Sequence, residues 1–349
     1  MSLQEALDSL LKLAGSDLLL SVGTSPQIRK DGVLRPIAEN AAPLTQADTE
    51  LMLRSILDED RWRELVSRRN VDFSFTWHDQ VRIRANAFYQ RGSLAAAFRM
   101  LPLAIPSFEE LGAPDALYDL IGRHQGLVLV TGPTGSGKST TQAAMIDYIN
   151  RTRHCHVVTI EDPIEYVHKH QAAIVDQREI GSDTPSFADA LRSVFREDPD
   201  VVLIGEMRDL ETISSALTIA ETGHLVLATL HTNDSSQAMD RILDGFPSGQ
   251  QEQIKVQLAA SLAGVVYQQL LPAVGGGRVA AYEVLIASAA VRALIKDGKT
   301  NQIRNFLQNS ARGGSQTLEK SLSQLLRTGI VTEREARARS LYPDEILTK

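Results

Sequence analysis

The stretch over residues 132–140 constrains this chain more than any other part of its sequence. It reads GPTGSGKST and fits the phosphate-loop pattern G-x-x-x-x-G-K-[ST] at every position. An apolar run over residues 126–131 precedes it, and a helix-forming stretch over residues 141–149 follows it. A buried strand, a glycine-rich turn and a helix in this order are typical of a parallel sheet that binds phosphate where its strands end.

Each residue type in this loop suits a phosphate ligand. Glycines let the backbone curl so that successive N–H groups point inward, and the helix that follows adds the positive end of its dipole. Lys138 can reach the β- and γ-phosphates, and the Ser139 hydroxyl can ligate Mg²⁺. We therefore predict an ATP and Mg²⁺ site whose nucleotide-binding residues are Gly132, Thr134, Gly135, Ser136, Gly137, Lys138, Ser139 and Thr140.

Composition limits the other classes of function. The net charge is −7, so no overall basic field attracts nucleic acid, and we expect no nucleic-acid partner. No apolar run approaches the roughly 18–20 residues that a membrane-spanning helix needs, and the first residues lack the features of a signal peptide. A single cysteine, Cys155, excludes an intrachain disulfide and a multi-cysteine zinc site. We expect a cytoplasmic protein.

The alternation of elements predicts four regions. Residues 1–100 have the pattern of a small α+β domain with an antiparallel sheet, including one helical stretch over 45–65. Residues 101–113, which begin with two prolines in six residues, are expected to be a linker. Strands and helices alternate over residues 114–288, which predicts a parallel sheet with crossover helices. Residues 289–349 are expected to be helical.

Polar side chains follow three of the predicted strands. Glu161 and Glu165 come after a strand over 157–160, and Glu206 comes after a strand over 201–204. Carboxylates at the carboxyl ends of parallel strands face the crevice where ligands bind. For one such cluster a solvated helix cap is the ordinary explanation, but two clusters beside a phosphate loop favour a Mg²⁺ site. His231 follows a fourth strand and could contact a phosphate, or serve only the structure.

Three arginines, Arg82, Arg84 and Arg99, cluster in the first region, outside the predicted nucleotide-binding core. The guanidinium group carries a fixed charge on a rigid fork, which suits contacts to a phosphate bound by another domain or subunit. For any one of these arginines taken alone, an ordinary position on the surface of a sheet is the more common explanation.

Four motifs, in order and spacing, resemble the secretion ATPases of type II secretion systems and type IV pili. They are GPTGSGKST at 132–140, TIEDPIEYVH at 159–168, VVLIGEMRD at 201–209 and TGHLVLATLHT at 222–232. The second and fourth are peculiar to this family, so the resemblance is more specific than a phosphate loop alone. It implies an α/β fold with a RecA-like P-loop ATPase core, an N-terminal PAS-like α+β domain and a helical C-terminal region.

The resemblance also implies roles for individual residues. Glu165 would activate the attacking water, and Glu206 would organise Mg²⁺ together with Ser139. His224 and His231 would contact or sense the γ-phosphate region. The arginines that the family brings to the nucleotide from the N-terminal domain would be Arg82, Arg84 and Arg99.

Two features place the resemblance in the pilus retraction branch of the family. The four-cysteine zinc insert of assembly-type relatives is absent, and AVRALIKD at 290–297 resembles the retraction signature AIRNLIRE. The branch implies a homohexameric ring that hydrolyses ATP to drive pilus retraction and twitching motility. Its implied partners are the inner-membrane platform protein, which holds it at the membrane, other pilus machinery and a paralogous retraction ATPase.

Three alternative functions share the same core. The chain could be an accessory retraction ATPase, because residues 87–91 and 227–233 also resemble that paralogue. It could be an ATPase of type II secretion or pilus assembly. A RecA-like motor that translocates DNA is the third alternative, and the acidic charge balance argues against it.

Overall fold

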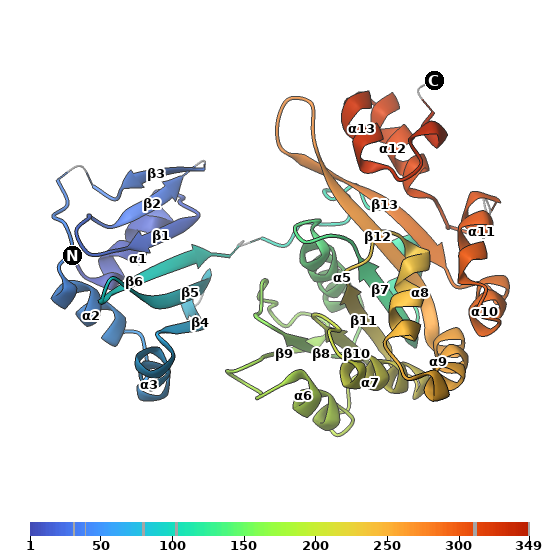
Figure 1. Ribbon diagram of the computed structural model, residues 1–349, viewed down its shortest axis with the longest axis horizontal. Coiled ribbons are helices and arrows are strands. Elements are labelled where there is room, and N and C mark those ends of the chain that lie inside the picture. The colour runs from blue at the N-terminus through green and yellow to red at the C-terminus, as the bar shows by residue number, and fades with distance from the viewer. Residues whose placement is uncertain (31, 39, 79–80, 102–103, 310–312, 348–349) are drawn as a thin grey trace. The chain divides into compact units, whose positions relative to one another are not determined.

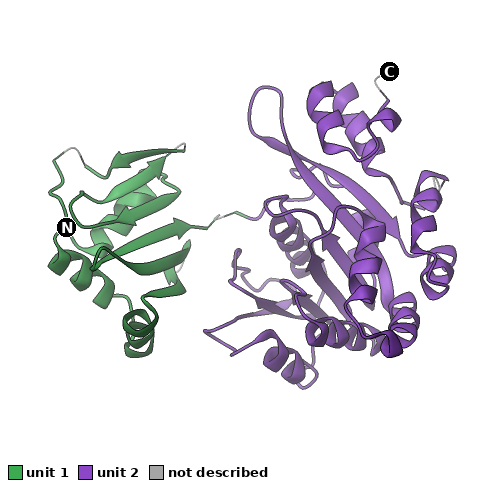
Figure 2. Ribbon diagram, viewed as in Figure 1, with its two compact units in different colours: residues 1–104 green, residues 105–349 purple. Residues whose placement is uncertain are grey.

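The computed structural model describes residues 1–349 except 31, 39, 79–80, 102–103, 310–312 and 348–349. It divides the chain into two compact units, Met1–Ala104 and Ile105–Lys349 (Figure 2). Two residues of the predicted linker, 102 and 103, lie outside the described part. The division of the chain into four regions stays a prediction. Among the described residues, no helix combines the length and apolar character needed to cross a membrane.

The first unit contains one six-stranded sheet in the order β3-β2-β1-β6-β5-β4, with every neighbouring pair antiparallel (Figure 1). The antiparallel sheet predicted for this part of the chain is confirmed. Its core lies between one face of the sheet and three helices, and Leu7, Leu53, Leu65 and Phe98 are among its buried residues. The elements are α1 (Leu3–Lys12), β1 (Asp17–Leu20), β2 (Gln27–Lys30), β3 (Val33–Pro36), α2 (Gln46–Arg54), α3 (Glu59–Arg68), β4 (Asn70–Trp77), β5 (Val81–Gln90) and β6 (Ser93–Met100).

The single helical stretch predicted over residues 45–65 is wrong, because the structure has two helices there. Thr45 and Asp48 form a reciprocal capping box at the start of α2, which ends at Arg54. The Asp58 carboxylate then accepts a hydrogen bond from the backbone N–H of Arg61 at 2.8 Å. That contact caps the start of α3. Because Asp58 itself has an extended backbone conformation, α3 is a separate helix and does not continue α2.

The second unit is built on a seven-stranded sheet in the order β13-β12-β7-β11-β10-β8-β9. All neighbouring pairs are parallel except β12 with β13, which confirms the predicted α/β fold. Every residue of β7 and β11 is buried. The strands are β7 (Gly126–Thr131), β8 (His156–Glu161), β9 (Ile174–Glu179), β10 (Val201–Ile204), β11 (Leu225–Leu230), β12 (Leu262–Pro272) and β13 (Arg278–Ile286).

Helices cover both faces of this sheet (Figure 1). Leu127 and Leu129 of β7 belong to one apolar core, with helices α6 to α11, and Val128 and Val130 belong to the other, with α4 and α5. Because successive side chains of a strand point to opposite faces of the sheet, β7 contributes to both cores. The helices are α4 (Ala116–Ile121), α5 (Lys138–Thr152), α6 (Phe187–Val194), α7 (Leu210–Glu221), α8 (Ser235–Asp244), α9 (Ser248–Ser261), α10 (Ala289–Lys296), α11 (Ile303–Asn309), α12 (Leu318–Arg327) and α13 (Glu333–Arg339), with short 3₁₀ helices η1 (Thr300–Gln302) and η2 (Pro343–Glu345).

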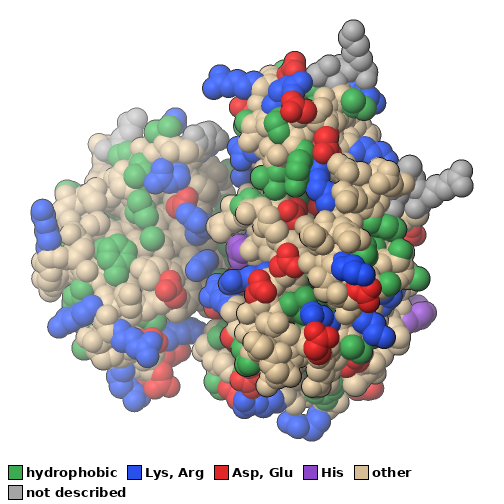
Figure 3. Space-filling view, turned by 45° about the vertical axis from the view of Figure 1, so that its right-hand side comes forward, with side chains coloured by type: hydrophobic (Ala, Val, Ile, Leu, Met, Phe, Trp, Pro, Cys, Tyr) green, Lys and Arg blue, Asp and Glu red, His purple; other side chains and the backbone are tan. Residues whose placement is uncertain are grey.

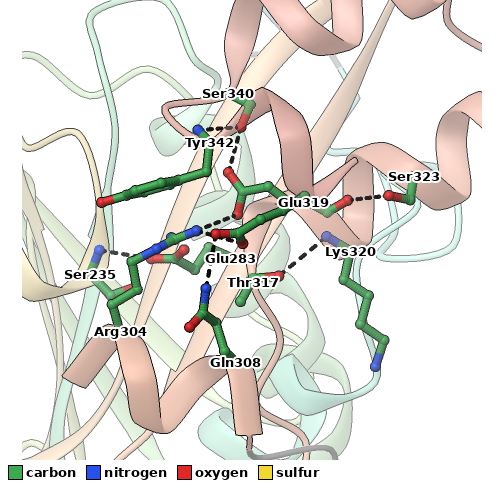
Figure 4. A network of polar contacts seen from close by, with 11 residues as sticks. Ser235, Glu283, Arg304, Gln308, Thr317, Glu319, Lys320, Ser323, Ser340 and Tyr342 are labelled. Carbon is green, nitrogen blue, oxygen red and sulfur yellow. Dashed lines mark hydrogen bonds and ion pairs between the residues drawn. The ribbon is translucent and has the colours of Figure 1, made fainter. Parts of the chain in front are cut away.

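The end of the chain folds against the β12–β13 hairpin through a smaller apolar core and a polar network around Arg304 (Figure 4). The Arg304 guanidinium lies 3.3 Å from a Glu319 carboxylate oxygen and 2.8 Å from one of Glu345. It also stacks over the Tyr342 ring, 3.3 Å from the centroid. The Ser340 hydroxyl donates to Glu319 at 2.6 Å. These contacts tie α11, α12 and the last residues together.

Candidate nucleotide-binding site

The phosphate loop joins the end of β7 to the start of α5, as the sequence predicts. Gly135 and Gly137 have φ values of 78° and 89°, in the left-handed region that favours glycine. At Gly132, an added Cβ would collide with the Gln268 carbonyl oxygen and lie 2.7 Å from the Ser136 hydroxyl oxygen. The glycines at 132 and 137 therefore let the loop approach β12 closely and turn into the helix.

The Lys138 side chain lies over its own loop. Its ammonium group donates to the carbonyl oxygens of Gly132 at 2.9 Å and Pro133 at 3.1 Å. Burial lowers the pKa of Lys138, while the negative charges of Glu206 and Glu165 act in the opposite direction. The ammonium group therefore lies close enough to two predicted acidic site residues for their charges to act on it.

Glu206 and His231 meet because their strands, β10 and β11, are neighbours in the parallel sheet. A Glu206 carboxylate oxygen lies 3.1 Å from His231 Nε2, and the other lies 2.8 Å from the Arg208 guanidinium. The half-buried Glu206 is thus held by one partner on each oxygen. Each residue was predicted to follow a buried strand, and the structure brings the two together; their chemical roles stay proposals.

Glu165 lies in the loop that follows β8, next to a second carboxylate with an altered pKa. Burial raises the pKa of Glu161 to about 7, although hydrogen bonds from Thr159 and Gln177 lower it, and the charge of Glu165 raises it further. Within the described residues, the Glu165 side chain makes no hydrogen bond or ion pair with another side chain.

The site fits Mg²⁺ by the chemistry of its oxygen donors. Ser139 follows Lys138 in the loop, and no hydrogen bond occupies its hydroxyl among the described residues; Glu206 supplies a carboxylate at the same edge. The described residues contain no cluster of three or more His, Cys, Asp or Glu side chains that could hold a metal alone. Mg²⁺ often takes only one or two protein oxygens and completes its shell with water and substrate phosphate, so this sparse donor set suits it.

His224 does not join this site within its own chain. It precedes β11, where its Nδ1 lies 3.1 Å from the Ile219 carbonyl oxygen. Leu225 pairs with Gly126 and Leu230 pairs with Thr131, so the phosphate loop is at the other end of these strands. Five residues of strand separate the two ends by roughly 17 Å. The prediction that His224 contacts the γ-phosphate region is therefore wrong for the loop of its own chain.

The three predicted arginines lie on β5 and β6 of the first unit. Arg99 makes an ion pair with Asp17 at 2.9 Å, and Arg82 donates to the Ser74 hydroxyl at 2.5 Å. Arg84 is exposed and stands opposite Arg99 in the strand register, so the two share one face of the sheet. Their contact with nucleotide stays a prediction.

Sequence reasoning missed two residues that support the loop. The Gln268 side chain, on β12, donates to the Ser136 carbonyl oxygen at 2.7 Å. The Tyr166 hydroxyl lies 3.0 Å from the Thr140 hydroxyl and so connects α5 to the Glu165 loop. Gln268 stands far from the phosphate loop in sequence, and only the pairing of β12 with β7 reveals the contact. Tyr166 lies inside a recognised motif, but its partner has no sequence signal.

The strand order and the phosphate loop define the core of a phosphate-loop ATPase, with β11 inserted between the strand of the loop and the strand of Glu206. The chain belongs to the family described as type II/IV secretion system protein, whose sequence model matches residues 25–338.

Three relatives show where the chain stands in this family. It is 43% identical over 344 residues to a protein of Pseudomonas aeruginosa named type IV pilus retraction ATPase PilT, and the match covers 99% of both chains. It is 38% identical to the type IV pilus ATPase PilU of the same organism, over 97% of this chain and 88% of that one. A crystal structure of the pilus retraction motor PilT with bound ADP superposes with a TM-score of 0.93, at 48% identity, over 99% and 98% of the two chains.

Proposed function

We propose that this chain is an ATP-hydrolysing motor that powers retraction of a type IV pilus. The observation that carries the proposal is the meeting of Lys138, Glu206 and His231 at one sheet edge beside the Glu165 loop. Similarity to PilT over nearly the whole of both chains supports the retraction role, and the lower identity to PilU favours PilT-like over accessory function.

The residues of the site divide the chemistry among them. The loop backbone binds the phosphates, and Lys138 exchanges the carbonyl oxygens of Gly132 and Pro133 for phosphate oxygens. Ser139 and Glu206 would hold Mg²⁺, which when bound neutralises charge on the phosphates. His231, whose Nε2 lies 3.1 Å from Glu206, would contact the γ-phosphate region.

Glu165 is the proposed general base, and its contacts favour it over Glu206. Both oxygens of Glu206 already have cationic or imidazole partners, whereas the Glu165 carboxylate has no side-chain partner among the described residues. A carboxylate without a side-chain partner is available to accept the proton of an attacking water, whereas both oxygens of Glu206 are already in contact with other side chains.

The chain is proposed to act as a homohexameric ring in which Arg82, Arg84 and Arg99 reach nucleotide. Arg99 could leave Asp17 and bind a phosphate without a change in its own charge, because the guanidinium keeps its proton throughout.

We expect Arg82→Ala and Arg99→Ala to lower ATP turnover about tenfold or more. Arg63→Ala is the control, since Arg63 is exposed on α3. Turnover and mass in solution are measured together; a fully active monomer, or arginine variants that equal the control, would contradict the ring.

The partners and cellular location remain part of the proposal. The motor would work in the cytoplasm, held at the inner membrane by the pilus platform protein, with a paralogous retraction ATPase as a further partner. No nucleic-acid partner is proposed. Acidic and basic side chains are intermixed over most of the face seen in Figure 3.

Deletion of the gene and imaging of surface pili test the function in the cell. Loss of a retraction motor should leave abundant, static pili, and restoring the gene should restore retraction. Absence of pili would indicate an assembly ATPase, and unchanged retraction would indicate another role. A steady-state ATPase assay of the purified chain, with and without DNA, checks the enzyme: DNA stimulation would favour a translocating motor.

A further inference from the structure

The loop that carries Glu165 is fastened immediately before and after that residue. On the preceding side, the Ile164 backbone N–H donates to a Glu179 carboxylate oxygen at 3.1 Å. On the following side, the Tyr166 carbonyl oxygen accepts from the Gln177 amide at 2.8 Å. Glu179 and Gln177 both belong to β9, at the edge of the sheet. Hydrogen bonds therefore hold the backbone on each side of Glu165, while its carboxylate has no side-chain partner among the described residues.

Both the nitrogen and the oxygen of the Gln177 amide make hydrogen bonds to this loop or to the last residue of β8 before it. The amide nitrogen donates to the Tyr166 carbonyl and also to Glu161 at 3.2 Å, and the amide oxygen accepts from the His168 backbone N–H at 2.8 Å. An amide can provide donors and an acceptor together, which neither a carboxylate nor an apolar side chain can do. Because Gln177 is half-buried, loss of these hydrogen bonds would leave polar groups of the loop unsatisfied and destabilise its conformation.

Tyr166 fastens the same loop to the phosphate-binding helix. Its ring is buried, and its hydroxyl lies 3.0 Å from the Thr140 hydroxyl, two residues after Lys138. Two independent contacts therefore meet at Tyr166, one from β9 to its carbonyl and one from α5 to its hydroxyl. Glu165, the residue before it, is thereby placed relative to both β9 and Lys138.

We propose that Gln177 and Tyr166 are positioning residues that hold Glu165 at the phosphate loop for ATP hydrolysis. The proposal rests on the proposed function, since it assigns a catalytic role to Glu165. Neither residue would touch nucleotide or water, so each acts only through the place of Glu165. A base displaced by about 1 Å can lose roughly 100-fold in rate, because the water must be within hydrogen-bond reach.

The test compares kcat, KM for ATP and affinity for a fluorescent ADP in the full chain. Gln177→Leu removes all three amide contacts, and Tyr166→Phe removes only the hydroxyl contact. We expect kcat to fall about 10- to 100-fold in Gln177→Leu and about threefold in Tyr166→Phe. KM and ADP affinity should stay within about twofold in Gln177→Leu, because the Gln177 contacts reach Glu161, Tyr166 and His168 and not residues 132–140. In Tyr166→Phe, which releases the Thr140 hydroxyl, the fall in kcat should exceed any change in KM or ADP affinity. Hydrogen exchange at residues 164–168 should increase in Gln177→Leu.

The control variant is Gln171→Leu, which makes the same chemical change at an exposed side chain near the loop. It should leave kcat and exchange at the wild-type level. A purely structural role for Gln177 and Tyr166 would lower melting temperature and ADP affinity along with kcat, and that pattern overturns the proposal. Wild-type kcat in both variants also overturns it while leaving the proposed function intact. A wild-type chain without ATPase activity would instead overturn the proposed function.

Discussion

Two clusters of charged residues in the unit Ile105–Lys349 differ in how their charges are satisfied. In the network around Arg304, the guanidinium has two carboxylates and an aromatic ring, and Glu319 also receives the Ser340 hydroxyl (Figure 4). At the phosphate loop, Lys138 has only neutral carbonyl oxygens within hydrogen-bond distance, and Glu165 has no side-chain partner among the described residues.

The difference indicates what each cluster is for. A buried charge destabilises a fold unless partners compensate for its lost hydration, and the Arg304 network provides those partners within the chain. The Glu319 side chain is only 4% exposed, so it depends on them. Among the described residues, Lys138 at the loop has no carboxylate within hydrogen-bond distance and Glu165 has no cation, and a bound phosphate would supply the missing partner of Lys138. The charges of the Arg304 network are therefore satisfied within the fold, whereas those at the loop have the pattern expected of a ligand site.

The largest effect is expected from Lys138→Ala. Loss of the ammonium group removes the cation that reaches the phosphates, so ATP turnover should be abolished and ATP binding weakened. Burial lowers the pKa of Lys138, which means that the fold disfavours its charged form. Removal of the ammonium group should therefore not lower the melting temperature measured without nucleotide. Lys320→Ala, at an exposed position on α12, is the control for both measurements. Normal turnover in Lys138→Ala would exclude this loop as the hydrolytic site.

Glu165→Gln should keep ATP binding and lose turnover by about 10²- to 10⁴-fold, since the amide keeps the shape of the carboxylate without its basicity. Glu206→Gln, measured beside it, should also alter the Mg²⁺ concentration needed for activity. Steady-state kinetics over a Mg²⁺ titration separate the two roles. If Glu165→Gln hydrolyses ATP normally, the base is elsewhere, and Glu206 or Glu161 would be examined next.

Arg304→Ala should have the opposite effect to Lys138→Ala: it should lower stability and leave nucleotide binding by the folded protein intact. It leaves Glu319 buried without its cation, at a cost of about 3–5 kcal/mol in the free energy of unfolding. Urea denaturation measures the change, and fluorescent ADP should still bind the folded fraction. Arg63→Ala, which breaks an ion pair whose two side chains are 74% and 89% exposed, should cost less than about 1 kcal/mol. Equal costs in the two variants would contradict the distinction between the clusters.

The smallest effect concerns the pH dependence of stability at Glu161. Its pKa rises from 4.5 to about 7 on folding, so its contribution to stability is complete below about pH 4.5 and is lost as pH rises through about 7. Glu161→Gln stays neutral, so its stability relative to wild type should increase by about 1–3 kcal/mol between pH 4.5 and pH 8. Urea denaturation across this range checks the slope. The exposed Glu252→Gln should show no such increase.

The sequence by itself determined the phosphate loop and the sheet around it. The loop pattern needs its glycines for backbone geometry, and Gly135 and Gly137 have the left-handed conformations that such a turn requires. Fully apolar strands predicted a sheet covered on both faces, as β7 and β11 confirm. Glu206 and His231 each follow a predicted strand, and they lie 3.1 Å apart because the carboxyl ends of these parallel strands align.

Tertiary structure alone decided which further side chains approach that edge and which predicted residue does not. His224 and His231 belong to the same motif, yet they lie at opposite ends of β11, since a strand separates its two ends by its full length. Gln268, Gln177 and Tyr166 approach the loop through strand order and side-chain direction, which local sequence patterns do not encode. Local patterns specify elements through short-range conformational preferences, whereas contacts between distant residues depend on how those elements pack.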